Sequence, residues 1–144
     1  MRPLLPLLAL LGLGLASPPP KVLHVKAEPA RSGYTFAVTL RTPDAGCKRY
    51  ADWWEVTDTD GKHLFYRRIL WHSHASEQPF TRSGGPVPIG PATVVVVRLH
   101  MHPEGYSPLA MKGSVQSGFL PVKLPKGFGA ALEQLPPQPE DCWF

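Results

Sequence analysis

The stretch 52-DWWEVTDTDGKHLFYRRILW-71 decides the fold. Two runs of β-prone residues, 52–57 and 62–71, flank the segment 58-DTDG-61. Asp-Gly is a strong signal for a two-residue type I′ turn, because both central positions of that turn require a positive φ. The stretch therefore predicts an antiparallel β-hairpin.

The register of this hairpin follows if residues 60–61 occupy the centre of the turn. Trp53 then lies opposite Arg68, where the two can stack, and Glu55 lies opposite Tyr66, within diagonal reach of Arg68. The other face of the hairpin is expected to point into the core. It carries four apolar side chains, Trp54, Val56, Phe65 and Ile69.

Further β-prone segments lie on both sides of the hairpin, at residues 21–28, 34–41, 93–102 and 113–123. Residues 75–92 are rich in Gly and Pro, so at most 80–82 or 87–89 are expected to form short edge strands. Residues 127–135 can form a short helix before an extended, proline-rich tail. Short strands separated by turns predict an all-β protein, an antiparallel immunoglobulin or fibronectin-III-like β-sandwich of about seven strands.

The N-terminal segment has the features of a secretory signal peptide. Residues 1–16 carry one positive charge, an apolar run and small residues at the expected cleavage site, where no cysteine offers a lipid anchor. The alternative, a membrane anchor, is disfavoured because a span needs about 20 apolar residues. We expect a secreted or periplasmic protein without a membrane span, in which a Pro-rich linker (17–20) precedes a β-sandwich domain (21–124) and a tail (125–144).

The sequence contains two cysteines, Cys47 and Cys142. An even number in an exported protein favours a disulfide, which here would clamp the tail onto the domain. Closing a loop of about 95 residues corresponds to roughly 4–5 kcal/mol in the chain-entropy description. The alternative, a pair of metal-binding thiolates, lacks Cys-x-x-Cys spacing.

The charge distribution argues against nucleic-acid binding. Loss of Arg2 with the signal peptide leaves 14 of the 15 Lys and Arg side chains against 11 Asp and Glu. The basic residues are scattered, and only Arg67 and Arg68 are adjacent. No polybasic patch is present that would favour nucleic acid or a membrane surface.

The motif His72-Ser73-His74 is the sharpest chemical signal in the sequence. Two histidines at positions i and i+2 of a strand share a face about 6.5 Å apart and can bind one metal ion. His100 and His102 repeat this spacing, so four imidazoles would suit copper or zinc if the two segments are adjacent. Glu77 is a candidate oxygen ligand. The alternative is that these histidines hydrogen-bond loop carbonyls or Glu77, or face solvent.

The segment 77-EQPFTR-82 has two interpretations. As a recognition loop, it would use Gln78 and Arg82, with Arg68 nearby, to bind a carboxylate or phosphate. As architecture, it would anchor Phe80 in the core and pair Glu77 or Arg82 with a neighbour, which for Glu77 would be Arg68. A polar loop with a buried aromatic residue favours the architectural interpretation.

Several of these motifs together resemble a family of small exported bacterial proteins with no assigned activity. They are 50-YADWWEV-56, the Asp60-Gly61 turn, the first His-x-His motif and 77-EQPFTRS-83. The resemblance covers roughly residues 45–120 and implies a secreted, single-domain β-sandwich. The second pair, His100 and His102, departs from the family pattern, so the resemblance implies no shared site there.

Enzyme signatures do not occur in the sequence. No serine lies in a G-x-S-x-G setting, and no Gly-rich phosphate loop follows a strand. The leading hypothesis is a non-enzymatic binding module for copper or zinc or an unidentified ligand. The alternative is a metal-free interaction or structural protein of the cell envelope. A metal-dependent redox enzyme is the third hypothesis.

Overall fold

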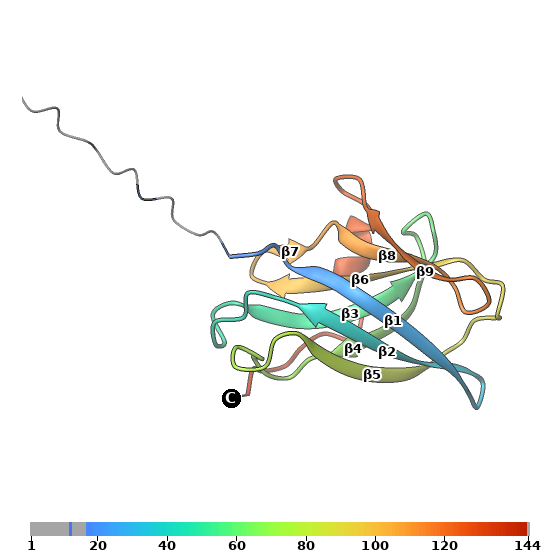
Figure 1. The fold of residues 1–144 in the computed structure, drawn as a ribbon, viewed down its shortest axis with the longest axis horizontal. Coiled ribbons are helices and arrows are strands. Elements are labelled where there is room, and N and C mark those ends of the chain that lie inside the picture. Colours follow the sequence, from blue (N-terminus) through green and yellow to red (C-terminus); the bar gives the residue numbers. More distant parts are fainter. Residues whose placement is uncertain (1–11, 13–16, 144) are drawn as a thin grey trace, which may run out of the picture.

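The computed structural model describes residue 12 and residues 17–143, so the expected signal peptide lies almost entirely outside the described residues. Nine strands and one short helix follow one another along the chain (Figure 1). They are β1 (Lys21–Ala30), β2 (Gly33–Arg41), β3 (Tyr50–Thr57), β4 (Leu64–Ile69), β5 (Phe80–Val87), β6 (Val95–His102), β7 (Gly105–Tyr106), β8 (Leu109–Ser114), β9 (Gly118–Lys123) and the 3-10 helix η1 (Ala130–Gln134).

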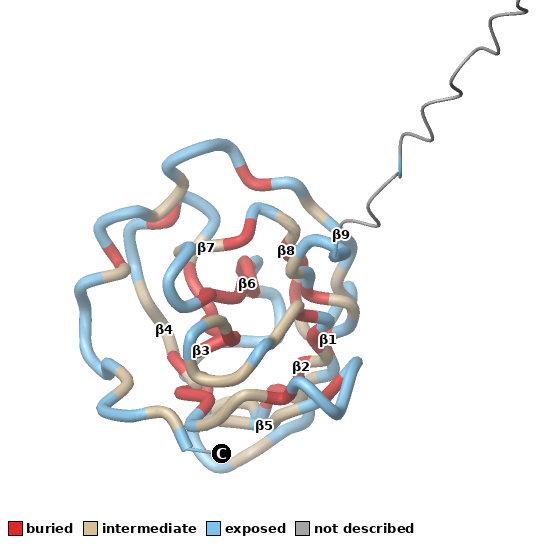
Figure 2. Tube along the Cα trace, turned by 90° about the vertical axis from the view of Figure 1, so that its left-hand side faces the viewer, coloured by how far each residue is buried: buried red, intermediate tan, exposed pale blue. Residues whose placement is uncertain are grey.

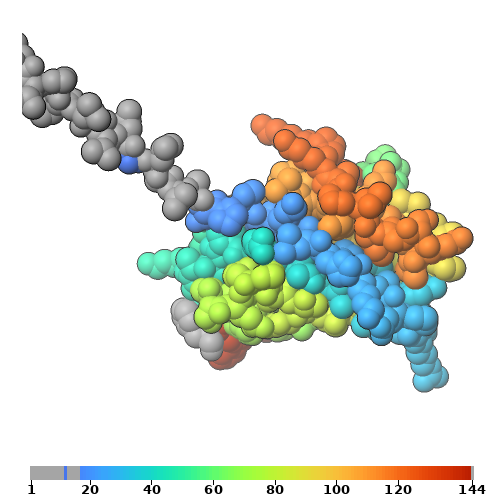
Figure 3. All heavy atoms as spheres, in the orientation of Figure 1, coloured from blue at the N-terminus to red at the C-terminus, as the bar shows by residue number. Residues whose placement is uncertain are grey.

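The strands form two antiparallel sheets that pack as a sandwich. One sheet has the order β1-β2-β5, and the other has the order β4-β3-β6-β8-β9, with β7 paired to β6. This arrangement confirms the predicted all-β sandwich, and its strand order suits an immunoglobulin-type fold. β1 also contacts β8, so the two sheets approach each other along that side, as Figure 3 shows from outside. Within the described residues, no helix is long and apolar enough to cross a membrane.

The core lies between the two sheets and follows the expected alternation of apolar residues. β3 and β6 contribute most of the buried backbone in the centre of the molecule (Figure 2). Its main members from four strands are Phe36, Val38, Leu40, Trp54, Val56, Phe80, Val95, Val97, Leu99 and Met101. Side chains at the intervening positions of β3 and β6, except His102 at the end of β6, are also buried, but on the opposite face of the larger sheet.

The hairpin predicted around residues 60–61 is present, but its register is shifted by one residue. Trp53 pairs with Ile69, and Glu55 pairs with Arg67 rather than with Tyr66. The connection is longer than a two-residue turn, because Asp58 N–H donates to His63 O at 3.1 Å and the Asp58 carboxylate caps the loop. The shift places Arg67 beside Trp53 and Glu55, the position that the sequence predicts for Arg68.

β5 is longer than the short edge pieces expected from its glycines and proline. It pairs only with β2, and an edge strand tolerates a proline because one row of its backbone N–H groups faces away from the ladder. Gly84 allows β5 to approach β4 closely, since a Cβ atom there would lie 2.6 Å from the Tyr66 hydroxyl. Because of its glycines, the sequence predicts only short edge strands here. In the structure, these glycines allow the strand to pack closely against its neighbour.

The segment 113–123 is a hairpin and not the single strand that the sequence predicts. β8 and β9 pair in register from Leu109–Lys123 to Ser114–Gly118. Gly118 has a φ of 82°, and the Ser114 hydroxyl accepts the Ser117 N–H at 3.0 Å, which together close a tight turn.

The C-terminal tail lies across the outer face of the six-stranded sheet. The predicted disulfide between Cys47 and Cys142 is present, and its Cα atoms are 5.7 Å apart. Beside it, Trp143 N–H donates to Trp71 O at 2.7 Å. The helix expected at 127–135 is shorter and is a 3-10 helix, η1.

Candidate functional site

The four candidate histidines lie in two separate places. His72 and His74 follow β4, with ring centroids 4.3 Å apart. His100 and His102 lie on β6, which β3 separates from β4. The four-imidazole cluster is therefore not formed, and among residues 17–143 no group of three or more His, Cys, Asp or Glu side chains is placed to hold a metal ion.

His74 has an unusual environment for a titratable side chain. It is 3 % exposed, and its ring stacks on Phe80 with 3.9 Å between centroids. Its backbone N–H donates to Asp44 Oδ2 at 2.8 Å, but its ring Nδ1 lies 3.9 Å from the same oxygen. Neither ring nitrogen has a hydrogen-bond partner in the described part of the chain. A buried polar group left without a partner costs about 1–3 kcal/mol. A ligand or a water molecule bound to this imidazole would offset that cost.

The loop that carries His74 is held by hydrogen bonds to the segment after β2. Gln78 Oε1 accepts the Thr42 N–H at 2.8 Å, and Gln78 Nε2 donates to His74 O at 3.1 Å. Asp44 Oδ1 accepts the Thr42 hydroxyl at 2.7 Å. Gln78 is thus engaged in building the loop, and Phe80 is 2 % exposed in the core as the architectural interpretation requires.

The charged side chains of this loop are mostly exposed and pair locally. Glu77 Oε2 accepts a hydrogen bond from Arg82 Nη2 at 3.2 Å, so its partner is Arg82 and not Arg68. Arg68 donates instead to Ser83 O at 2.8 Å. Arg68 and Arg82 thus each donate to protein acceptors in this structure, and anion binding by Gln78, Arg82 and Arg68 stays a prediction.

Burial lowers the pKa of His74 from 6.5 to about 4, and the nearby positive charges of Arg82 and His72 act in the same direction. The carboxylates of Asp44 and Glu77 oppose this shift but do not cancel it. His74 is therefore a neutral imidazole at pH 7, which is the form that binds metal ions.

We expect the metal-free protein to lose stability as the pH falls from 6.5 to 4. In this window the unfolded chain protonates His74 while the folded protein does not, so the free energy of unfolding decreases with falling pH. Urea denaturation in EDTA at pH 7 and pH 4.5 measures the change. His74→Phe should show a smaller loss, and an equal loss in both proteins would contradict the assignment.

A second cluster lies on the outer face of the six-stranded sheet, and the sequence predicts only the part made by Trp53, Glu55 and an arginine, with Arg68 in place of Arg67. Glu55 is fully buried and accepts from Arg67 Nη2 at 2.8 Å and from Arg98 Nη2 at 3.0 Å. Trp53 Nε1 donates to Glu55 at 2.6 Å, and the Tyr106 hydroxyl donates at 3.0 Å. One carboxylate thus receives four side chains from three strands and the short β7.

The two arginines of this cluster also bind the C-terminal tail through backbone carbonyls. Arg67 donates to Leu132 O at 2.7 Å and to the carbonyls of Leu135 and Pro137. Arg98 donates to Phe128 O at 2.6 Å and to Gly129 O at 2.9 Å. The tail therefore covers the ion cluster and satisfies its remaining donors.

His100 belongs to this covered face rather than to a metal site shared with His74. Its Nδ1 lies 2.6 Å from Asp52 Oδ1, and its Nε2 lies 3.4 Å from Glu133 Oε2. Its ring stacks on Trp53 at 3.7 Å between centroids. His102 is exposed and lies beside Tyr50. The sequence carries one signal for this face: charged residues occupy alternate positions in strands that are otherwise β-prone.

The chain is similar to a curated protein from Halomicrobium mukohataei that is described as a "Putative lipoprotein". The two are 46 % identical over 84 residues, which are 58 % of this chain and 40 % of the relative. The chain thus matches less than half the length of that relative. No protein-family model matches the chain, and no solved structure matches it significantly.

Proposed function

We propose that this protein is an exported binding module that acts without catalysis and binds Cu(II) or Zn(II) through His72 and His74. The observation that carries the proposal is the buried His74 imidazole, whose two ring nitrogens lack hydrogen-bond partners in the described residues while a second imidazole lies 4.3 Å away between centroids. An ion bound by one of these nitrogens would remove the cost of burying it.

The residues around His74 suit a metal-binding histidine. Neutral imidazole nitrogen is a preferred ligand of both ions. Asp44 lies 3.9 Å from Nδ1, near enough to accept a hydrogen bond from Nδ1–H after a small movement and leave Nε2 for the ion. Phe80 fixes the plane of the ring. With two protein ligands, the remaining coordination positions would be filled by water or by a ligand, so the site would be open.

Export is the part of the proposal that rests on the sequence and on the relative. Three observations support export: the expected signal peptide, the pairing of both cysteines and the description of the relative as a lipoprotein. The proposal does not include lipid attachment at either cysteine, because Cys47 and Cys142 are bonded to each other.

A second candidate function is a metal-free interaction module of the envelope, and one observation favours it. Trp71 and Trp143 are 40 % and 63 % exposed, and their backbones are hydrogen-bonded to each other. Exposed tryptophans are common in the centres of protein interfaces. The metal titration below separates the two candidates.

Isothermal titration of the purified protein with CuCl2 and with ZnCl2 tests the metal site. We expect one ion per chain and a loss of at least tenfold in affinity for both His72→Gln and His74→Phe. His63→Gln is the matched control, because His63 lies in the β3–β4 loop and contacts Phe65. Binding that is equally tight in the wild type and in both site variants would contradict the proposal.

A further inference from the structure

A cleft of about 320 Å³ opens beside the end of β9, away from the histidine loop. Its main lining residues are Arg98, Tyr106, Pro108, Lys123, Lys126 and Phe128. Its volume lies at the lower end of the range of about 300–1,000 Å³ that is usual for small-molecule pockets. Neither proposed metal ligand takes part in it.

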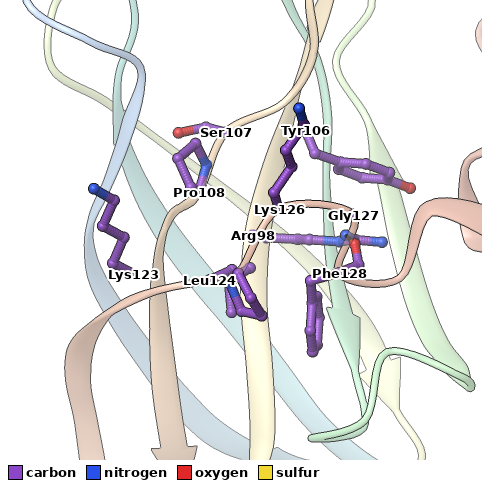
Figure 4. Close-up of a pocket in the computed structure, with 10 residues that line it drawn as sticks. Arg98, Tyr106, Ser107, Pro108, Lys123, Leu124, Lys126, Gly127 and Phe128 are labelled. Carbon is purple, nitrogen blue, oxygen red and sulfur yellow. Dashed lines mark hydrogen bonds between the residues drawn. The ribbon is translucent and has the colours of Figure 1, made fainter.

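At the inner side of this cleft, a buried arginine stacks with two aromatic rings. Figure 4 shows the Arg98 guanidinium between the rings of Tyr106 and Phe128, whose centroids lie 3.4 and 5.4 Å from its central carbon. Both ends of this guanidinium are already engaged, by Glu55 and by tail carbonyls. Arg98, whose side chain is fully buried, therefore holds Tyr106 and Phe128 beside the cleft, while its hydrogen bonds remain within the protein.

The rim of the cleft is positively charged. Lys123 and Lys126 lie on either side of Pro108 in Figure 4. Neither lysine forms an ion pair with any residue in the described part of the chain. The residues that line the cleft include no Asp or Glu. Two unpaired ammonium groups above aromatic and proline side chains are complementary to a negative group on an apolar body.

A second cleft of about 380 Å³ continues the first toward the N-terminal linker. The two share Tyr106, Ser107, Pro108 and Lys123, and the second ends at Pro19 and Pro20. Its acidic side chain, Glu104, already pairs with Arg49. The continuous groove therefore keeps its positive character and has room for an elongated molecule.

We propose that this groove binds a small organic anion, a carboxylate attached to an aromatic or aliphatic body. Lys123 or Lys126, which lie on opposite sides of Pro108, would pair with the carboxylate, and Pro108, Tyr106 and Phe128 would contact the apolar part. Water exclusion by these rings would strengthen the ion pairs relative to fully exposed ones. The proposal goes beyond the metal site and stands or falls separately from it.

The probes are 3-phenylpropionate and octanoate, each compared with its neutral amide. We expect both acids to bind saturably by isothermal titration and to bind at least tenfold more tightly than the amides. They should also shift the amide resonances of the non-proline residues that line the cleft, Tyr106, Ser107, Lys123, Leu124, Lys126, Gly127 and Phe128. The double variant K123M/K126M should weaken binding of the acids about tenfold, because no ammonium group would remain on the rim to pair with the carboxylate. Lys112→Met, on the exposed side of β8, is the matched control.

The outcomes separate this site from others. Acids that bind the double variant as tightly as the wild type, amides that bind as well as acids, or no saturable binding of either acid would overturn the proposal. Resonance shifts confined to residues 72–82 would also overturn it, because the ligand would then occupy the histidine loop. A wild-type unfolding midpoint for the double variant excludes misfolding as the cause of any loss.

Discussion

Replacing Glu55 by Ala is expected to lower the free energy of unfolding by about 3–5 kcal/mol, which is the usual effect of removing one partner from a buried ion cluster. The variant would leave Arg67 and Arg98 buried without their shared carboxylate. It would also remove the acceptor of the Trp53 and Tyr106 side chains. Equilibrium urea denaturation, followed by tryptophan fluorescence, measures the change.

Glu77→Ala is the matched control for this experiment. Glu77 forms an ion pair with Arg82 at the surface, and such a pair contributes at most about 1 kcal/mol. A loss of less than 1 kcal/mol in Glu55→Ala would show that the two arginines are solvated in solution, and the buried cluster described above would be wrong. Glu55→Gln should fall between wild type and Glu55→Ala, since an amide keeps the shape and accepts hydrogen bonds without a charge.

Removing the disulfide with C47S/C142S is expected to cost about 2–5 kcal/mol of stability, as in other small exported domains. The bond closes a loop with a sequence separation of 95 residues, so reduction frees a long segment in the unfolded chain. The double variant is preferred to either single one because it leaves no unpaired thiol. The wild type denatured in excess reductant should have the same free energy of unfolding as C47S/C142S.

Hydrogen exchange adds a local readout to this comparison. The tail beyond η1 should exchange faster in C47S/C142S, because the bond and the Trp143–Trp71 hydrogen bond hold its end. The β3–β6 ladder should exchange only with global unfolding, because it lies at the centre of the core. Unchanged stability, or unchanged exchange in the tail, would contradict a clamping role for the bond.

The two effects act on the same element, since the arginines and the disulfide both hold the tail against the sheet. Arg67 and Arg98 bind five tail carbonyls, which are backbone groups present in any sequence. Three of these carbonyls belong to Phe128, Gly129 and Leu132, at the start of η1 and within it, and two belong to Leu135 and Pro137 in the extended part of the tail that follows. The tail thus takes the place of water as the hydrogen-bond partner of the charged side chains on this face of the sheet.

The sequence predicted the class of fold because strand alternation is a local property. In β6, Val95, Val97, Leu99 and Met101 all point into the core as their spacing indicates. The disulfide was likewise predictable from the cysteine count and the expected export. By contrast, the hairpin register depended on how Asp58 capped its loop, and a one-residue error there exchanged Arg67 for Arg68.

By itself, the sequence determined the all-β character, the buried Phe80 and the Cys47–Cys142 pairing. Only the tertiary structure decided which charged residues meet and which histidines do not. The order of strands places β3 between β4 and β6, which separates the two histidine pairs and brings Glu55 between Arg67 and Arg98. The physical reason is that alternation sets the face on which a side chain lies, whereas the neighbour on that face depends on strand order and register.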